Sequence, residues 1–531
     1  MVRLSLERLS RMEAEFEQAN VRMGEAVWNT YSGEGAADLD GAQREISRIL
    51  TNSPDRALVD GWLEGIDRKA EPLLARRLQV WSNCFKGSAV DNMPEIYTLK
   101  NRLQERIANF QLNLDGKPLR RSDLQKLLRN EPDRALRHRA WRSIAALAEA
   151  NRADLRRLIG LRNAGARALG YRDYVDLVLK LQELDESWLH QTLDRLAAEA
   201  RPLYRALIGS LERKIGEGPL APWDVAFAMR QGFQLPDSYF PADKALERLR
   251  ATVRGIGFEI DSLPIRTVVR DIPFGGYTVA VRIPSDARFI VNPSEGHGFY
   301  TTTFHEYGHS LQAACTTIEW PILKEYEWVL GAHTPAYSEG MAEVLGGFAR
   351  RADWLRSMAA VPEAEVERYR TQLLPAQMAA RLFDLLLNMR VELAAYAGEE
   401  DMAACERRLT SDVRLLQFPA EDPPQWEANT WYTSYPVYWH NYILAALIAD
   451  QINETITERF GSTANPEVSG YLQANFYATG NAVPWMDRIT NGTRKPLSPD
   501  AYLKKIHRAS SGSITQNATT DEHRAAKPQP N

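Results

Sequence analysis

Apolar side chains recur at steps of three and four residues through much of the first 260 positions. Leu9, Met12, Phe16, Met23 and Val27 follow this spacing, with Glu and Arg residues between them. Because residues three and four apart share one face of an α-helix, the pattern predicts long amphipathic helices. No fixed-period repeat is evident, which argues against a helical solenoid.

A different pattern occupies residues 264–292. The segments 265–269, 277–283 and 288–291 are rich in β-branched residues, and Pro and Gly residues bound them. This pattern predicts a small antiparallel sheet. Directly after it we expect a helix over about 301–315, capped by a hydroxyl group in its first residues.

The later part of the chain is again helical in pattern. Helices are expected near 338–360, 363–397 and 434–460. From residue 509 onward the chain is polar and has no apolar period. We therefore expect residues 509–531 to form a disordered tail.

Composition excludes several classes of protein. The chain has 531 residues, of which 44% are hydrophobic, and a net charge of -4. This composition is typical of a folded globular protein. The chain has no long block of Lys or Arg, so we expect no nucleic-acid partner. It has no run of about 18 apolar residues, so we expect no membrane-spanning segment.

The N-terminus and the cysteines indicate the compartment. The first residues lack an apolar stretch followed by small residues, so we expect no signal peptide. Cys84, Cys315 and Cys405 are far apart and form no CxxC pattern. This usage favours a reducing compartment over a disulfide framework, and we expect a cytoplasmic protein.

Residues 304–310 read FHEYGHS and carry the candidate chemistry. His305 and His309 are four residues apart on a predicted helix, so both can bind one zinc ion. Glu306 can then reach a water molecule on that zinc and act as general base. The alternative is a pair of histidines that serve only the packing or solvation of the helix.

A catalytic zinc site needs a third protein ligand and one open position. The segment AYSEGMAEVLGGF, residues 336–348, places Glu339 and Glu343 on one predicted helical face. We expect Glu339 to be the third ligand and Glu343 to hydrogen-bond a ligand histidine. Glu343 stays open as an alternative ligand, and a solvated acidic face is the alternative without metal.

Tyr435, Tyr438 and Tyr442 repeat at steps of three and four, so we expect them to line one helical face. A phenol directed at an oxyanion would stabilise a tetrahedral intermediate. The alternative is an aromatic stripe packed in the core. His297 and His333 flank the HEYGH motif in predicted loops and are candidates for substrate contact, although a structural role is the ordinary alternative.

The chain resembles the zinc oligopeptidases of the thimet oligopeptidase and oligoendopeptidase F type, which are gluzincins. The motifs that carry this resemblance are HEYGH, the following helix with two Glu residues, and YxxYxxxY. The chain is also similar to their angiotensin-converting-enzyme relatives. The resemblance covers most of the chain up to about residue 508. Further similar segments are EAVWNTYSGE (25–34), LRNAGARALGYRDYVDL (161–177), APWDVAFA (221–228) and PWMDRITNGTRKPLSPDAYLKKI (484–506).

The resemblance implies a mainly α, elongated, two-lobed zincin-like peptidase with the small sheet beside the active-site helix. Residues 1–508 would form one domain, and a deep central channel would admit short unstructured peptides. The resemblance implies one zinc ion per chain on His305, His309 and Glu339, with Glu306 as general base.

The resemblance also implies roles for the tyrosines and the sheet. Tyr438 matches the tyrosine that stabilises the oxyanion, and Tyr435 matches one that contacts the C-terminal side of the substrate. Tyr442 is a further candidate for substrate binding. The strand near 276–280 lies where the family pairs an edge strand with the substrate backbone.

Two departures from the family pattern matter. The spacing from His305 to Glu339 is a few residues longer than in these relatives, which keeps Glu343 open as a ligand. The converting enzymes have a histidine seven residues before the first tyrosine of the stripe, where this chain has Ala428. Their carboxylate-binding lysine has no counterpart here. These differences favour an endo-acting oligopeptidase over a dipeptidyl carboxypeptidase.

The expected function is therefore that of a zinc metalloendopeptidase that cleaves short peptides. An enzyme dedicated to one leader or propeptide is an alternative with the same fold. Alternatives from other classes are a non-catalytic peptide-binding protein and a helical scaffold without metal. The intact HEYGH argues against the peptide-binding protein, whereas metal content discriminates the scaffold. The oligomeric state stays open, and a monomer is plausible.

Overall fold

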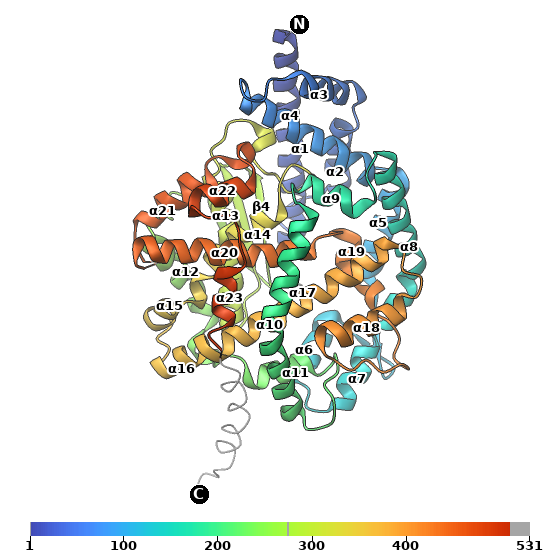
Figure 1. Cartoon of the computed structure of the whole chain (residues 1–531), viewed down its shortest axis with the longest axis vertical. Helices are drawn as coiled ribbons and strands as arrows, with labels where there is room; N and C mark the ends of the chain where they lie inside the picture. Colours follow the sequence, from blue (N-terminus) through green and yellow to red (C-terminus); the bar gives the residue numbers. More distant parts are fainter. Residues whose placement is uncertain (1, 273–274, 463, 510–531) are drawn as a thin grey trace, which may run out of the picture.

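The computed structural model describes residues 2–272, 275–462 and 464–509, and helices dominate it. In Figure 1, α1 lies along the long axis at the N-terminal end, with α3 and α4 beside it. Helices α5, α8, α18 and α19 lie on one side of the view, and α13, α14 and α20 to α22 on the other. The predicted tail lies outside the described residues, apart from its first residue.

Helices before the sheet follow the amphipathic pattern of the sequence. They are α1 (Val2–Ser32), α2 (Leu39–Leu50), α3 (Ser53–Gly65), α4 (Pro72–Asp91), α5 (Pro94–Asn109), α6 (Arg121–Asn130), α7 (Arg134–Arg142), α8 (Ala145–Ala168), α9 (Tyr174–Leu181), α10 (Glu186–Ile215), α11 (Val225–Gly232) and α12 (Ala245–Gly255). None of the helices in the described ranges has the length and apolarity needed to cross a lipid bilayer.

Helices after the sheet carry most of the candidate residues. They are α13 (His297–Cys315), α14 (Pro335–Gly346), the 3₁₀ turn η4 (Phe348–Arg350), α15 (Ala352–Ser357), α16 (Glu363–Arg368), the π-turn η5 (Tyr369–Leu373), α17 (Leu374–Ala397), α18 (Met402–Arg414), α19 (Thr430–Ser434), α20 (Trp439–Phe460), α21 (Glu467–Leu472), α22 (Trp485–Thr493) and α23 (Asp500–Ile506). The segment predicted as 338–360 is thus divided by η4, whereas 363–397 is helical throughout and contains the π-turn η5.

The predicted sheet is present, but its strands are not all antiparallel. Strands β3 (Ile265–Val269), β4 (Gly276–Arg282) and β5 (Asp286–Val291) are arranged in the order β3-β5-β4. β4 pairs with β5 in antiparallel orientation, whereas β3 pairs with β5 in parallel orientation. A separate hairpin joins β1 (Leu112–Leu114) to β2 (Lys117–Leu119).

Alternation along the strands sends side chains to helices on both faces of the three-stranded sheet. Val279 and Val281 of β4 are buried in one apolar cluster with residues of α1. Phe289 of β5 points the other way, and its ring centroid lies 5.6 Å from that of Tyr307 on α13. The sheet therefore lies between α1 and α13, which fixes the position of the HEYGH helix.

The HEYGH helix begins earlier than the sequence indicates. α13 starts at His297, and its N-cap is Gly296, with a φ of 98° and no side-chain cap. The predicted start at 301 with a hydroxyl cap is therefore wrong. A positive φ is accessible to glycine without steric cost, so Gly296 permits the sharp entry into the helix.

α14 is held between α13 and α20 by close contacts at two glycines. A Cβ atom at Gly308 of α13 would lie 2.8 Å from the Cα atom of Ala342 on α14. A Cβ atom at Gly340 of α14 would lie 2.8 Å from a methyl carbon of Ile448 on α20. Both glycines let neighbouring helices approach more closely than any side chain would allow.

We predict that Gly308→Ala destabilises the protein by about 1–3 kcal/mol, because the added methyl group overpacks the contact with the α14 backbone. Thermal unfolding of the two proteins measures the difference. Gly298→Ala on the same helix is the matched control, because nothing lies within 4 Å of a Cβ atom there. Equal melting temperatures for the Gly308 variant and the wild type would contradict the close contact.

Candidate active site

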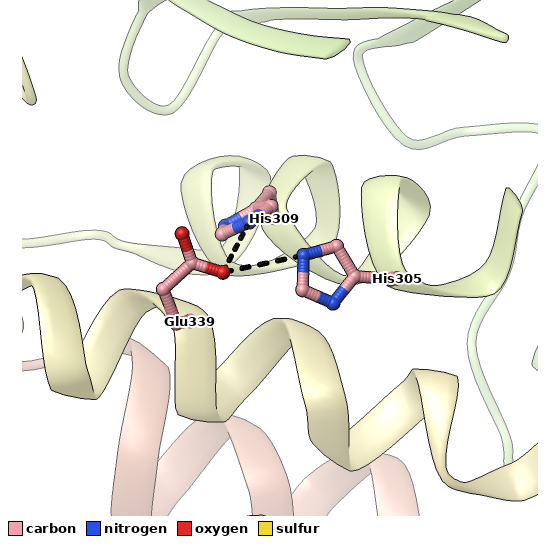
Figure 2. Close-up of side chains that lie close together, drawn as sticks. All are labelled: His305, His309 and Glu339. Carbon is pink, nitrogen blue, oxygen red and sulfur yellow. Dashed lines mark ion pairs between the residues drawn. The ribbon is translucent and has the colours of Figure 1, made fainter. Parts of the chain in front are cut away.

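Three side chains from two helices converge on one point. His305 and His309 come from α13 and Glu339 comes from α14 (Figure 2). The Oε2 atom of Glu339 lies 3.3 Å from Nε2 of His305 and 3.8 Å from Nε2 of His309. One ligand atom from each of the three residues lies within 4.8 Å of the other two.

This geometry fits a bound zinc ion. Two ligands at about 2.0–2.1 Å from a tetrahedral zinc ion are about 3.3 Å apart, close to the spacing of His305 and Glu339. Glu339 is only 8% exposed. Its Oε2 atom has no hydrogen-bond partner among the described residues. A buried carboxylate oxygen without such a partner is unfavourable, and a cation at this position would satisfy it.

The electrostatics of the group also favour a positive charge. Burial opposes a charge on His305, but Glu339 and Glu343 outweigh it and raise the pKa of His305 to about 10. Burial and the positive charge of His305 lower the pKa of His309 to about 4. The two carboxylates thus favour positive charge at the place where the ligand atoms meet.

Polar side chains lie next to the Nδ1 atoms of both histidines. The Oε1 atom of Glu343 lies 3.5 Å from Nδ1 of His305, on the opposite side of the ring from Glu339. The hydroxyl group of Ser338 lies 3.3 Å from Nδ1 of His309. Arg350 donates to Glu343 Oε2 at 2.7 Å and so holds that carboxylate. Glu343 is therefore outside the group of ligand atoms, where it can orient His305.

Glu306 lies against the edge strand β4. The hydroxyl group of Thr278 is 2.9 Å from Oε2 of Glu306 and 2.7 Å from the backbone oxygen of the same residue. A Cβ atom at Gly276 would lie 2.7 Å from Cγ of Glu306, so this position requires glycine. Burial raises the pKa of Glu306. A carboxyl group with a raised pKa is suited to accept and return a proton.

The three tyrosines gather beside the ligand group, but not on one helical face. Tyr438 is the N-cap of α20, and Val437 before it has a φ of 56°, so only Tyr442 lies within the helix. The rings of Tyr438 and Tyr442 are nonetheless 5.4 Å apart, and those of Tyr435 and Tyr438 are 5.9 Å apart. The prediction of one helical face is wrong, but the predicted clustering is present.

Tyr438 makes the direct contact with the ligand group. Its hydroxyl group donates to Oε1 of Glu339 at 2.8 Å. Burial and the negative charge of Glu339 raise the pKa of Tyr438 well above its ordinary value. The phenol therefore keeps its proton and remains a hydrogen-bond donor next to the candidate metal position.

The two flanking histidines occupy different surroundings. His297 is the first residue of α13, and its Nε2 atom lies 2.9 Å from the carbonyl oxygen of Ala349. His333 lies in the segment before α14, and its buried Nδ1 atom has no hydrogen-bond partner within the described ranges. Burial lowers the pKa of both imidazoles. Substrate contact by either residue stays a prediction.

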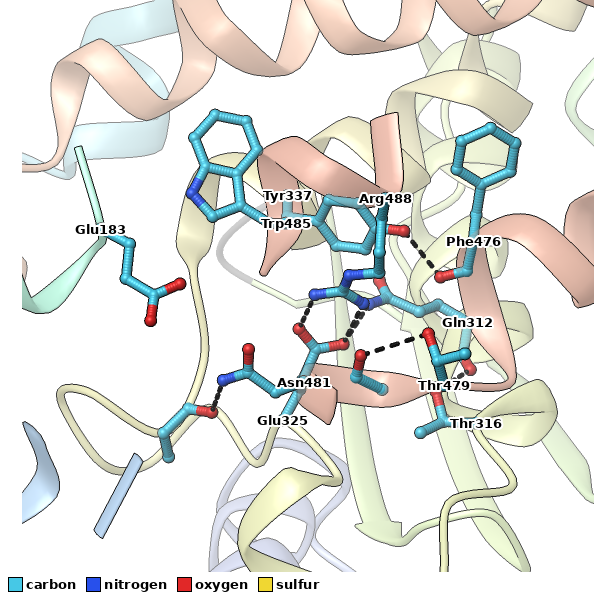
Figure 3. A network of polar contacts seen from close by, with 12 residues as sticks. Glu183, Gln312, Thr316, Glu325, Tyr337, Phe476, Thr479, Asn481, Trp485 and Arg488 are labelled. Atoms are coloured by element: carbon cyan, nitrogen blue, oxygen red, sulfur yellow. Dashed lines mark hydrogen bonds and ion pairs between the residues drawn. The ribbon is translucent and has the colours of Figure 1, made fainter. Parts of the chain in front are cut away.

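A buried ion pair connects both ligand-bearing helices to the C-terminal part of the chain (Figure 3). Arg488 of α22 donates to the two carboxylate oxygens of Glu325 at 2.6 and 3.1 Å. Its guanidinium group lies 3.7 Å from the ring centroid of Tyr337 on α14, and Gln312 on α13 lies 3.4 Å from Glu325. Arg488 thus contacts α14 directly at Tyr337, two residues before Glu339. It contacts α13, the helix that carries both histidines, indirectly through Glu325 and Gln312.

Sequence reasoning missed Thr278, Arg350, Glu325 and Arg488. Thr278, Glu325 and Arg488 act across a large separation in sequence, and no local pattern marks their partners. Arg350 is only seven residues from Glu343, but the 3₁₀ turn η4 that brings it back to that carboxylate was not predicted. Gly276 was the available signal for the contact of β4 with Glu306, because a glycine inside a strand often marks a close approach.

Comparisons with known proteins agree with this fold. A sequence model of peptidase family M3 matches residues 127–260, a region that ends before the HEYGH motif. A search of curated protein sequences finds no match.

Two solved structures resemble almost the whole chain. The M32 carboxypeptidase from Deinococcus radiodurans R1 has a TM-score of 0.67 at 14% identity, over 97% of this chain and 99% of the other. PZ peptidase A, solved with an inhibitor, has a TM-score of 0.66 at 14% identity, over 91% of this chain and 88% of the other.

The chain therefore shares the mainly helical fold of these two solved peptidases, which confirms the predicted mainly α fold class with a small sheet. The resemblance stated from the sequence agrees with the local match of residues 127–260 to the model of peptidase family M3 and with the fold shared with the two solved peptidases. Three finer points stay predictions. They are the assignment to the thimet oligopeptidase or oligoendopeptidase F type, the relation to the converting enzymes, and the central channel.

We predict that Glu339→Gln weakens zinc binding more than Glu343→Gln does. The first change removes a charged ligand atom, whereas the second removes a group that orients a ligand, which costs about 10- to 100-fold in affinity. Competition with a chelator measures both affinities, and the two variants are matched in size and charge. The reverse order would make Glu343 the third ligand.

Proposed function

We propose that this chain is a zinc-dependent metallopeptidase that hydrolyses peptide bonds in short, unstructured peptides. The observation that carries the proposal is the convergence of His305, His309 and Glu339, with Glu306 next to them. The local match to peptidase family M3 and the fold shared with two solved peptidases support it.

His305, His309 and Glu339 would hold the metal, one ion per chain. When bound, a zinc ion polarises the scissile carbonyl group and lowers the pKa of a water molecule to about 7. Glu343 and Ser338 keep the two imidazole rings in the orientation that presents Nε2.

Glu306 is proposed as the proton-transfer group. Its carboxylate accepts a proton from the attacking water and then donates it to the leaving amine, so one residue acts first as base and then as acid. Thr278 fixes this carboxylate against β4 by its hydroxyl group. Burial of Glu306 raises its pKa and makes the return of the proton easier.

Tyr438 and β4 are proposed to position the substrate. The phenol of Tyr438 remains protonated and can donate a hydrogen bond to the oxyanion that develops on the scissile carbonyl. β4 is an edge strand of its sheet, so its outer backbone groups can pair with an extended peptide. Tyr435, which is 47% exposed, and Tyr442 would contact neighbouring substrate residues.

The proposed substrates are peptides of many sequences, cleaved internally in the cytoplasm without a nucleic-acid or membrane partner. An enzyme dedicated to one leader or propeptide, or one that removes C-terminal residues, would use the same catalytic groups. The names of the two similar structures include a carboxypeptidase, so the position of the cut is the property that separates these modes. A peptide-binding protein without activity is the alternative from another class.

We predict that Glu306→Gln binds one zinc ion per chain but loses most of its turnover, because the ligands remain and the base is gone. Metal analysis and digestion of a mixed peptide library, run on the wild type and the variant, test this. Unchanged cleavage by the variant would reject Glu306 as the base. A zinc-loaded wild type that cuts no peptide would favour a binding role.

We predict that Tyr438→Phe lowers kcat by about 10²- to 10³-fold with little change in KM, the effect of losing one oxyanion donor. The phenyl ring preserves the contacts with Tyr435 and Tyr442, so packing is a minor factor. Steady-state kinetics on one peptide measure both constants. An unchanged kcat would transfer the role to another donor, and a rise in KM alone would indicate ground-state binding.

A further inference from the structure

A cavity of about 630 Å³ adjoins the candidate active site on the side of α17, α20 and α23. Glu343 and Tyr442 belong both to its lining and to the surroundings of the candidate metal position. Its volume is in the range of about 300–1,000 Å³ that is typical of small-ligand pockets. None of the catalytic roles proposed above uses it.

The lining of the cavity carries an excess of positive charge. Eight arginine and lysine side chains and five acidic side chains line it. Every one of the five acids already has a basic partner: Glu343 pairs with Arg350, Asp353 with Arg351, Asp450 with Lys505, Glu454 with Lys504 and Glu458 with Lys495. The cavity therefore offers no carboxylate that is free to receive a cation.

Two arginines of the lining have no acidic partner among the described residues, namely Arg381 of α17 and Arg508. Arg356 and Arg370 also line the cavity, but they pair with Glu363 and Glu367 outside it. Burial and, to a smaller extent, the charge of Arg370 lower the pKa of Arg508. An anion is the ligand that this arrangement lacks.

Of the two unpaired arginines, Arg381 is the one that contacts a tyrosine of the candidate active site. Its side chain is exposed, and its guanidinium carbon lies 5.6 Å from the ring centroid of Tyr442. The ring of Tyr442 is in turn 5.4 Å from that of Tyr438, which hydrogen-bonds Glu339. The guanidinium carbon of Arg381 is therefore at most about 11 Å from the ring centroid of Tyr438. This distance is the length of about three residues of extended chain.

We propose that this cavity is a subsite for a carboxylate of the peptide substrate, bound by Arg381 with Arg508 in support, within about three residues of the scissile bond. The proposal rests on the proposed peptidase function and adds a specificity-determining residue to it. A guanidinium group matches a carboxylate in a bidentate, charge-assisted pair, which is the strongest contact available in this lining. The carboxylate can be the free C-terminus of the peptide or an Asp or Glu side chain.

A set of peptides with one common sequence tests the proposal. Within this set, each position up to three residues from the cleaved bond is replaced in turn by Asp, Asn or Lys. Each peptide is made in two forms, one with a free C-terminus and one with an amidated C-terminus. The zinc-loaded wild type, Arg381→Met and Arg381→Lys are compared by kcat and KM. Methionine keeps the apolar contact with Tyr442 and removes only the charge.

The expected result is a fall in kcat/KM of about 10- to 100-fold for Arg381→Met on the preferred carboxylate peptide, mainly through KM. For the Asn or C-terminally amidated peptide, kcat/KM of Arg381→Met should differ from that of the wild type by less than about twofold. Arg381→Lys should keep part of the preference for the carboxylate peptide over the neutral one. A preference lost on amidation identifies the C-terminus, whereas one lost on Asp→Asn identifies a side chain. Arg205→Met on α10, an exposed arginine outside the lining, is the matched control.

Binding measured by calorimetry in the Glu306→Gln background separates this proposal from the proposed function. A wild type that cuts no peptide rejects the function, while tighter binding of the carboxylate peptide that disappears in Arg381→Met still supports the subsite. Equal binding and equal cleavage of acidic and neutral peptides overturn the subsite and leave the function intact. An equal loss on all peptides, with a lowered melting temperature, also overturns it, because Arg381 would then be structural.

Discussion

Helices α13 and α14 meet backbone to backbone at Gly308 and Ala342, and the candidate metal site depends on this contact. His305 and His309 are on one helix and Glu339 is on the other, so the spacing of their ligand atoms follows from the spacing of the helix axes. A larger residue at position 308 would move the carboxylate away from both imidazoles. The glycine within HEYGH is therefore as much a part of the site as the histidines, although it has no functional group.

The same packing explains why the polar groups of the site are so strongly coupled. Bringing α14 against α13 buries Glu339 and Glu343 beside two imidazoles, where charges interact more strongly than in water. Burying a carboxylate in this way is unfavourable unless it is paired. Arg350 offsets the cost for Glu343, and a cation would do so for Glu339. The Arg488–Glu325 pair ties the same two helices to α22, so the C-terminal region contributes to the rigidity of the site.

The sequence predicted what depends on local periodicity and missed what depends on the approach of distant segments. The i, i+4 spacing correctly placed His305 with His309, because a helix fixes that relation by itself. The parallel pairing of β3 with β5 was missed, because strand direction is decided by how the chain crosses the sheet. The break before Tyr438 did have a local signal. Pro436 disfavours a helical conformation for Tyr435, which ends α19 with a φ of -133°.

Glu343 connects the two halves of the proposed site. One of its oxygens faces Nδ1 of His305 and the other accepts from Arg350 at 2.7 Å, while the same side chain lines the cavity next to Arg381. A carboxylate that entered the cavity would meet a wall whose acids are already paired, so it would not have to displace Glu343 from His305. Because the cavity supplies its own unpaired arginines, it can bind an anion while the orientation of His305 is preserved. Orienting a metal ligand, by Glu343 of α14, and selecting a charged substrate group, by Arg381 of α17, are thus assigned to different helices and do not compete for the same partner.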